Sequence, residues 1–169
     1  MSDNVLRTAD GHPVDLDKVD FHEIARRGDA EVLEAFLQAG IDPDRRDERG
    51  HTLLMIAAYA DQEPTTTLLL ARGADPDAPD ESGNTPLMAM AFKGYLERAR
   101  QLLDAGAQPN RKNPAGASAL HFAATFGQLD VAALLVARGA DADAADDQGR
   151  TPADLARANG HDFLADRLG

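Results

Sequence analysis

Residues 80–112 read DESGNTPLMAMAFKGYLERARQLLDAGAQPNRK, and this stretch decides the fold of the chain. Its first residues are typical of a turn in which Gly83 supplies a positive φ. A threonine then caps a helix that starts at Pro86, where the missing N–H of proline costs nothing. Gly94 ends this first helix, and Gly106 ends a second one. The stretch therefore predicts a turn, a helix, a second turn, a second helix and a loop.

The same order of turns and helices recurs along the chain every 33 residues. Three ladders of glycine residues follow this spacing, with Asp61 in the place of one missing glycine. The ladders are Gly50, Gly83, Gly116 and Gly149; Gly40, Gly73, Gly106 and Gly139; and Gly28, Gly94, Gly127 and Gly160. A pair of helices this short cannot bury its apolar face alone, so each unit must stack on its neighbours. We therefore expect an all-α solenoid.

The recurring unit resembles the ankyrin repeat. The resemblance rests on three segments, which are residues 83–87 (GNTPL), 149–153 (GRTPA) and 119–124 (ALHFAA). It covers residues 14–169 and implies an ankyrin-repeat solenoid of stacked helix-turn-helix units with β-turn fingers. The implied number of repeats is about five, including two caps. These segments are specific for the fold and say little about function.

The period divides the chain into units. The predicted boundaries are an N-terminal arm at 1–13, a capping repeat at 14–46, complete repeats at 47–79, 80–112 and 113–145, and a truncated capping repeat at 146–169. The repeat at 47–79 has Leu53 where proline is usual, and it lacks the usual Gly-His after its first helix. We expect a rearranged turn before its second helix for this reason. In the last repeat, a short second helix is expected over residues 161–168.

The composition of the chain limits its chemistry and its partners. Its 169 residues carry a formal net charge of −12, which argues against nucleic acid and anionic membranes because a phosphate needs a positive face. The acidity suits plain solubility and a basic partner equally well. Cysteine is absent, so disulfides, thiolate metal sites and a cysteine nucleophile are excluded. The sequence shows no apolar stretch long enough to cross a bilayer and no secretory signal, so we expect a cytoplasmic protein.

Catalytic and metal-binding motifs fail at specific residues. After His22, the position that a zinc protease needs for its second histidine holds Arg26. Ser118 lies at the threonine position of the repeat, which favours a helix N-cap over a nucleophile. His22 and His121 share the position at which a histidine of an ankyrin repeat bonds to the backbone of a neighbouring turn. The acidic run at 141–147 lacks the distal glutamate of a calcium loop. We therefore expect no enzyme activity, no cofactor and no metal site.

The resemblance implies that recognition takes place on a concave face made of the first helices and the finger tips. The candidate partner-binding residues at the ends of the first helices are Arg26, Arg27, Tyr59, Phe92, Lys93 and Phe126. Those at the finger tips are Arg46, Arg49, His51, Glu81, Asn84 and Lys112. The three aromatic residues suit a binding hot spot, and the alternative is that they pack between repeats.

The charges of the finger tips alternate along the chain. The second tip is acidic through Asp75, Asp77, Asp80 and Glu81, the third is basic through Arg111 and Lys112, and the fourth is acidic again. Such alternation would select a partner by charge complementarity. A solvated charged rim is the alternative interpretation.

The chain is therefore expected to be a non-catalytic adaptor, a monomer that binds a protein partner through its concave face. Two other functions stay open. Residues 84–95 and 119–127 resemble small bacterial ankyrin proteins, some of which are linked to catalase and oxidative-stress defence. The other alternative is an immunity protein that neutralises a basic toxin, because an acidic concave surface suits a basic nuclease.

Overall fold

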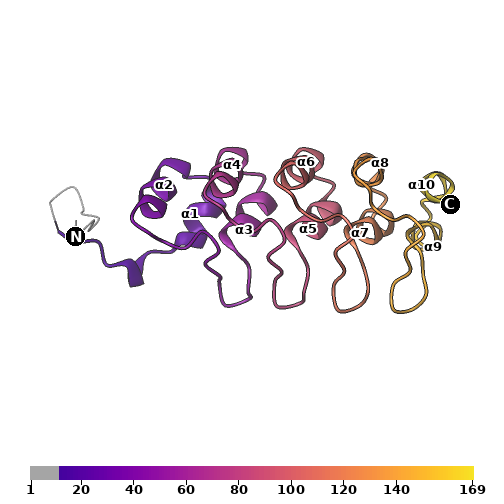
Figure 1. Ribbon diagram of the computed structural model, residues 1–169, viewed down its shortest axis with the longest axis horizontal. Coiled ribbons are helices and arrows are strands. Elements are labelled where there is room, and N and C mark those ends of the chain that lie inside the picture. The colour runs from indigo at the N-terminus through magenta and orange to yellow at the C-terminus, as the bar shows by residue number, and fades with distance from the viewer. Residues whose placement is uncertain (1–11) are drawn as a thin grey trace.

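The fold is a single row of stacked helix pairs (Figure 1). The computed structural model describes residues 12–169, in which every regular element is a helix. The elements are η1 (Leu16–Lys18), α1 (Phe21–Arg27), α2 (Ala30–Gln38), α3 (Leu53–Tyr59), α4 (Glu63–Ala71), α5 (Pro86–Lys93), α6 (Leu96–Asp104), α7 (Ala119–Thr125), α8 (Leu129–Ala137), α9 (Pro152–Ala158) and α10 (Asp162–Leu168). The predicted all-α solenoid of helix-turn-helix units is confirmed. Residues 1–11 of the predicted arm at 1–13 lie outside the described residues, and the unit boundaries stay predictions.

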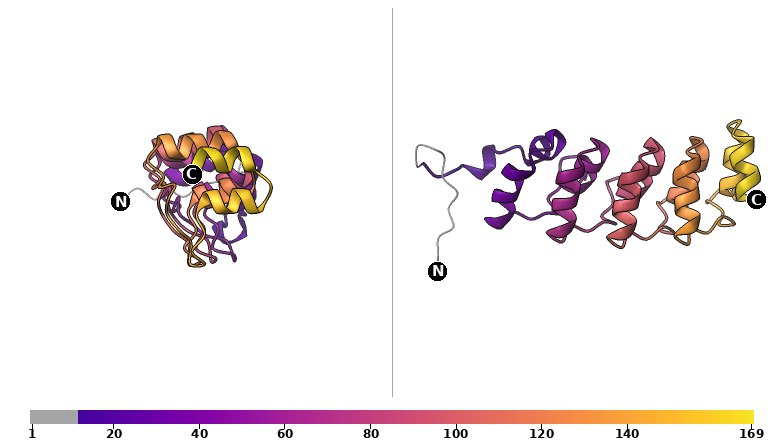
Figure 2. Two further views of the ribbon diagram at one scale, coloured as in Figure 1. Left: turned by 90° about the vertical axis from the view of Figure 1, so that its right-hand side faces the viewer. Right: turned by 90° about the horizontal axis from the view of Figure 1, so that it is seen from above.

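The helices form two layers (Figures 1 and 2). The inner layer holds α1, α3, α5, α7 and α9, which pack on one another in chain order, and the outer layer holds α2, α4, α6, α8 and α10. Four loops project from the inner layer as fingers, at 41–51, 74–84, 107–117 and 140–150. We call the surface of the inner helices and of these fingers the concave face.

Small and medium-sized aliphatic side chains fill one core that runs along the row. In the first four units an alanine lies at the same inner-helix position (Ala25, Ala58, Ala91 and Ala124), and each is 0% exposed. Because alanine has no side chain beyond Cβ, neighbouring inner helices can approach closely at these positions. In α6, Ala99, Leu102 and Leu103 are all buried. The core is therefore continuous from one unit to the next.

The ends of α5 follow the local sequence. Its N-cap Thr85 accepts a hydrogen bond from the backbone N–H of Met88 at 3.3 Å, and Pro86 is the first helical residue. Gly94 follows the last helical residue in the left-handed conformation, with a φ of 74°. Ser118 occupies the N-cap position of α7, as its place in the repeat predicts.

The turn before α4 keeps the form of the other units, so the predicted rearrangement is wrong. Residues 60–62 separate α3 from α4, and Asp61 adopts a φ of 57° where the other units have glycine. Aspartate is one of the few residues that adopts this conformation without large strain. Its carboxylate also lies 3.3 Å from the guanidinium of Arg98, whose side chain is 6% exposed. Glu63 contacts the same guanidinium at 3.2 Å. Asp61, which replaces the usual glycine, therefore helps to join two neighbouring units.

The recurring acidic residues of the loops connect one unit to the next. Asp44 accepts a hydrogen bond from the backbone N–H of Asp75, and Asp77 accepts one from that of Gln108, at 2.9 and 3.1 Å. Asn110 accepts the equivalent bond from the next unit at 2.8 Å. These side chains satisfy backbone donors that the loops would otherwise leave without a partner. The sequence Asp-Pro-Asp, which stands at 42–44 and 75–77, therefore has a structural role between units.

Candidate functional site on the concave face

Each finger is built around one Asp or Asn side chain. These residues are Asp47, Asp80, Asn113 and Asp146, and each accepts hydrogen bonds from the backbone N–H groups two and four residues later at 2.8–3.0 Å. Adjacent fingers also bond directly, for example from the N–H of Glu81 to the carbonyl of Arg49 at 3.3 Å. Because the fingers are internally bonded and linked, they present their side chains from an ordered backbone.

The three predicted aromatic residues lie at the surface, where two contact each other and the third contacts a lysine. Tyr59, Phe92 and Phe126 are 46%, 39% and 46% exposed. The rings of Phe92 and Phe126 meet edge to face, with centroids 4.6 Å apart. Lys93 Nζ lies 4.8 Å from the centroid of Tyr59 and 5.2 Å from that of Tyr95, within the range of cation–π attraction. The three rings are therefore partly exposed, while Phe92 and Phe126 also pack on each other across adjacent repeats.

A groove of about 780 Å³ lies at the N-terminal half of the concave face. Four predicted residues line it: Arg26, Arg49, His51 and Tyr59. His51 Nδ1 lies 3.0 Å from a carboxylate oxygen of Asp47. Burial raises the pKa of Asp47, but hydrogen bonds from the backbone and ring of His51 and from the backbone of Arg49 outweigh it and lower the pKa overall. The groove therefore combines the cationic side chains of Arg26 and Arg49 with the aromatic ring of Tyr59.

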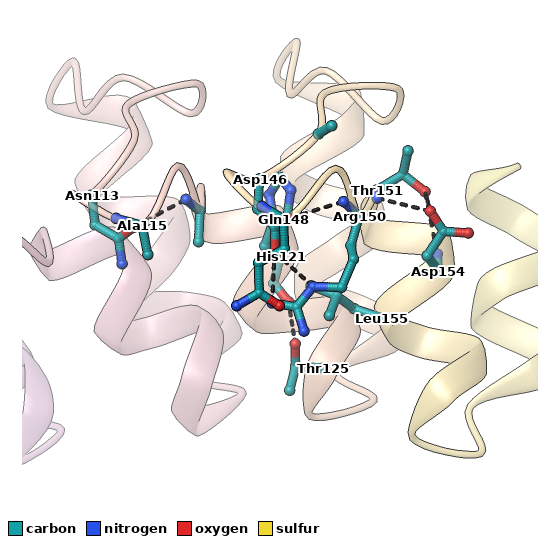
Figure 3. Close-up of polar contacts among 12 residues, drawn as sticks. Asn113, Ala115, His121, Thr125, Asp146, Gln148, Arg150, Thr151, Asp154 and Leu155 are labelled. Carbon is teal, nitrogen blue, oxygen red and sulfur yellow. Dashed lines mark hydrogen bonds and ion pairs between the residues drawn. The ribbon is translucent and has the colours of Figure 1, made fainter.

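A second groove, of about 320 Å³, lies at the C-terminal half and is mostly apolar. Phe122, Phe126 and Leu155 line it, together with alanines of the third finger. Figure 3 shows His121 of α7 close to the finger that carries Asp146 and Arg150. His121 is buried, and its Nδ1 accepts a hydrogen bond from the N–H of Ser118 at 3.2 Å. Burial lowers the pKa of His121 and outweighs the opposing hydrogen bond with the backbone of Arg150.

Asp146 holds the last finger through an ion pair with Arg150, at 2.7 Å (Figure 3). The side-chain hydrogen bond from Arg150, followed by backbone hydrogen bonds, lowers the pKa of Asp146 from 3.8 to about 2. Because this pKa is lower in the folded state, the carboxylate stabilises the fold above about pH 4 and that contribution is lost as the pH falls towards 2.

We expect the substitution Arg150→Gln to raise the pKa of Asp146 towards, but not up to, 3.8, because the backbone hydrogen bonds remain. Carbon-13 NMR titration of the Asp146 carboxyl group measures this shift. Asp154, whose pKa is lowered by hydrogen bonds from Thr151, is the internal control and should keep its value. An unchanged pKa of Asp146 in the variant would contradict the assignment of the shift to Arg150.

The comparisons with known proteins agree with this architecture. A family model described as "Ankyrin repeats (3 copies)" matches residues 21–113, and one described as "Ankyrin repeats (many copies)" matches residues 102–156. The chain belongs to the ankyrin repeat family. Ankyrin repeats are generally modules of protein–protein interaction. A search of curated proteins found no match for this chain.

The other predicted residues of this ankyrin repeat protein divide into exposed and structural groups. Arg46 donates to the carbonyl oxygens of Gly50 and Pro79, and Lys112 donates to that of Ala145 at 2.9 Å. These two cations therefore link neighbouring fingers. The side chain of Asn84 accepts a hydrogen bond from that of Asn113 at 2.9 Å, which has the same effect. Arg26 and Arg27 form ion pairs within their own unit, and Glu81 is exposed on the second finger.

The prediction was wrong about one surface charge, and it missed two residues of the apolar groove. Asp77 is only 5% exposed and bonds to the backbone of the next unit, so it adds nothing to the acidic surface of the second finger. Phe122 and Leu155 line the apolar groove, and sequence reasoning missed them. Phe122 lies one helical turn before Phe126, so the spacing of the two residues was an available signal.

His22 has the structural role that the family resemblance implies, and His121 has a different one. The Nε2 atom of His22 lies 3.3 Å from the carbonyl oxygen of Arg45, in the next finger. His121 lies at the same repeat position, but its ring bonds through Nδ1 with Ser118 at the start of its own helix. No helix within residues 12–169 is long and apolar enough to span a membrane.

Proposed function

We propose that the chain is a non-catalytic module that binds a protein partner through its concave face. The observation that carries this proposal is the exposure of Tyr59, Phe92 and Phe126, of which Tyr59 lines the first groove and Phe126 the second. Large aromatic rings left partly in water and flanked by cations are typical of the residues that dominate binding energy at interfaces. The rings lie at the C-terminal ends of packed inner helices, which reduces the entropy lost on binding.

The polar side chains in the grooves support binding over catalysis. His121 is buried and holds the N-terminus of α7, and both side-chain oxygens of Asp146 bond within the last finger. Groups that general acid–base chemistry would need are therefore used to build the site. The net charge of −12 supports a protein partner over nucleic acid or an anionic membrane.

The triple substitution of Tyr59, Phe92 and Phe126 by alanine tests the proposal. We expect partner capture from a lysate of the source organism to fall by at least about tenfold, since each hot-spot ring contributes more than about 1 kcal/mol. Affinity capture with quantitative mass spectrometry measures the loss. The thermal midpoint should change little, because these rings lie at the surface.

The matched control is Phe163→Ala, which removes a ring that is 62% exposed on α10 of the outer layer. This variant should capture partners like the wild type. Partners retained equally by the triple variant would place recognition elsewhere. A triple variant that unfolds would show instead that the rings belong to the core.

A further inference from the structure

The charges of this acidic chain are distributed unevenly over the concave face. The N-terminal groove is lined by Arg26, Arg49 and His51 and by two carboxylates, those of Asp47 and Asp80. A further depression of about 470 Å³, separate from the apolar groove, adjoins the N-terminal groove, and Arg26 and Arg49 line it as well. Arg45, Arg46 and His22 contribute further basic side chains to that depression, and Asp20, Asp47 and Glu48 contribute carboxylates. Basic side chains therefore gather at one end of a molecule whose net charge is −12.

The two carboxylates of the groove are engaged by the fingers themselves. One oxygen of Asp47 accepts hydrogen bonds from the backbone N–H groups of Arg49 and His51, and the other lies 3.0 Å from the His51 ring. Asp80 accepts bonds from the N–H groups of Ser82 and Asn84, both at 2.9 Å. Backbone donors therefore compensate much of the negative charge before a ligand arrives.

The guanidinium of Arg49 has no hydrogen bond or ion pair with any other part of residues 12–169, and the residue is exposed. Arg26 has only an exposed ion pair with Glu23, at 2.6 Å, and such pairs contribute little. A guanidinium binds a carboxylate with two parallel N–H···O bonds, which makes both arginines suited to an acidic side chain. Met55, Ile56 and Tyr59 line the same groove and offer an apolar surface next to the cations.

We propose that the N-terminal groove binds an acidic segment of the protein partner, with a carboxylate between Arg26 and Arg49 and an apolar side chain against Met55, Ile56 and Tyr59. This inference rests on the proposed function and adds the charge of the partner. The inference predicts that a basic partner does not bind at this end of the concave face. Since the arginines are exposed, binding should weaken as the ionic strength rises.

The experiment is a selection of phage-displayed random peptides on the full chain. We expect the selected peptides to be enriched in Asp and Glu next to an apolar residue. Synthetic copies should bind the double variant Arg26→Glu/Arg49→Glu at least about tenfold more weakly than the wild type. Copies in which Asn and Gln replace Asp and Glu should also lose binding.

The control is Arg111→Glu, which reverses one charge instead of two at an exposed arginine outside the three depressions, and it should leave binding unchanged. The milder Arg26→Gln/Arg49→Gln variant serves if the charge reversal impairs folding. This inference would be overturned by peptides that bind the aromatic residues without being acidic. It would also be overturned by peptides that bind both arginine variants as tightly as the wild type. Either result would leave the proposed function standing. If no selected peptide depends on the arginines or on Tyr59, Phe92 and Phe126, both proposals fail.

Discussion

Replacing Leu120 by alanine is expected to lower the free energy of unfolding by about 2–5 kcal/mol. Leu120 is 0% exposed in α7, which packs between α5 and α9. The truncation leaves a cavity at the junction of three units, and the stability of a solenoid depends on the contacts between neighbouring units. Urea denaturation followed by circular dichroism measures the loss.

The matched control for this prediction is Val136→Ala, which shortens an aliphatic side chain that is 44% exposed on α8. We expect it to change the free energy of unfolding by less than about 0.5 kcal/mol. Equal losses for the two variants would contradict the continuous core between the inner helices.

Replacing Gly83 by alanine is expected to destabilise the protein strongly. Gly83 has a φ of 78°, and an alanine Cβ at this position would lie 2.3 Å from Cδ of Pro114 in the next finger. The backbone conformation alone costs about 1–2 kcal/mol for a residue with a side chain. Displacing a proline ring adds about 1–3 kcal/mol, because the ring cannot rotate away. We therefore expect a loss of about 2–5 kcal/mol in the free energy of unfolding, measured by denaturation.

Gly149 provides a control for this prediction within the same chain. It occupies the same position in the last finger, with a φ of 76°, and has no atom within 4 Å of where its Cβ would lie. The substitution Gly149→Ala should therefore show only the backbone cost. The double variant Gly83→Ala/Pro114→Ala should recover most of the difference. Equal losses for Gly83→Ala and Gly149→Ala would contradict the close approach of neighbouring fingers.

Most of the helical architecture could be predicted because its signals are local. Thr85, Pro86 and Gly94 determine the ends of α5 through their own backbone preferences, and the period repeats those signals along the chain. The wrong prediction concerned Asp61. It adopts the left-handed φ of the glycine that it replaces, and only its ion pair with Arg98 of the next unit joins residues far apart in the sequence.

The candidate site could be predicted only in part. The resemblance placed Tyr59, Phe92 and Phe126 on the concave face, and the structure shows all three exposed. It did not show that Phe126 packs on Phe92 of the preceding unit, or that Lys93 reaches the ring of Tyr59. Arg46 and Lys112 were grouped with the binding residues, but the structure has them bonded to the backbone of the following finger.

The sequence by itself determined the period, the order of turns and helices and the apolar face of each helix, because these follow from residues close together in the chain. Only the tertiary structure decided which charges remain available at the surface. Asp77 and Arg49 are both charged loop residues, yet stacking buries the first against Gln108 and leaves the second exposed in a groove. The physical reason is that a side chain's partners in a solenoid come from the neighbouring unit, about 33 residues away, and only the geometry of stacking brings them within bonding distance.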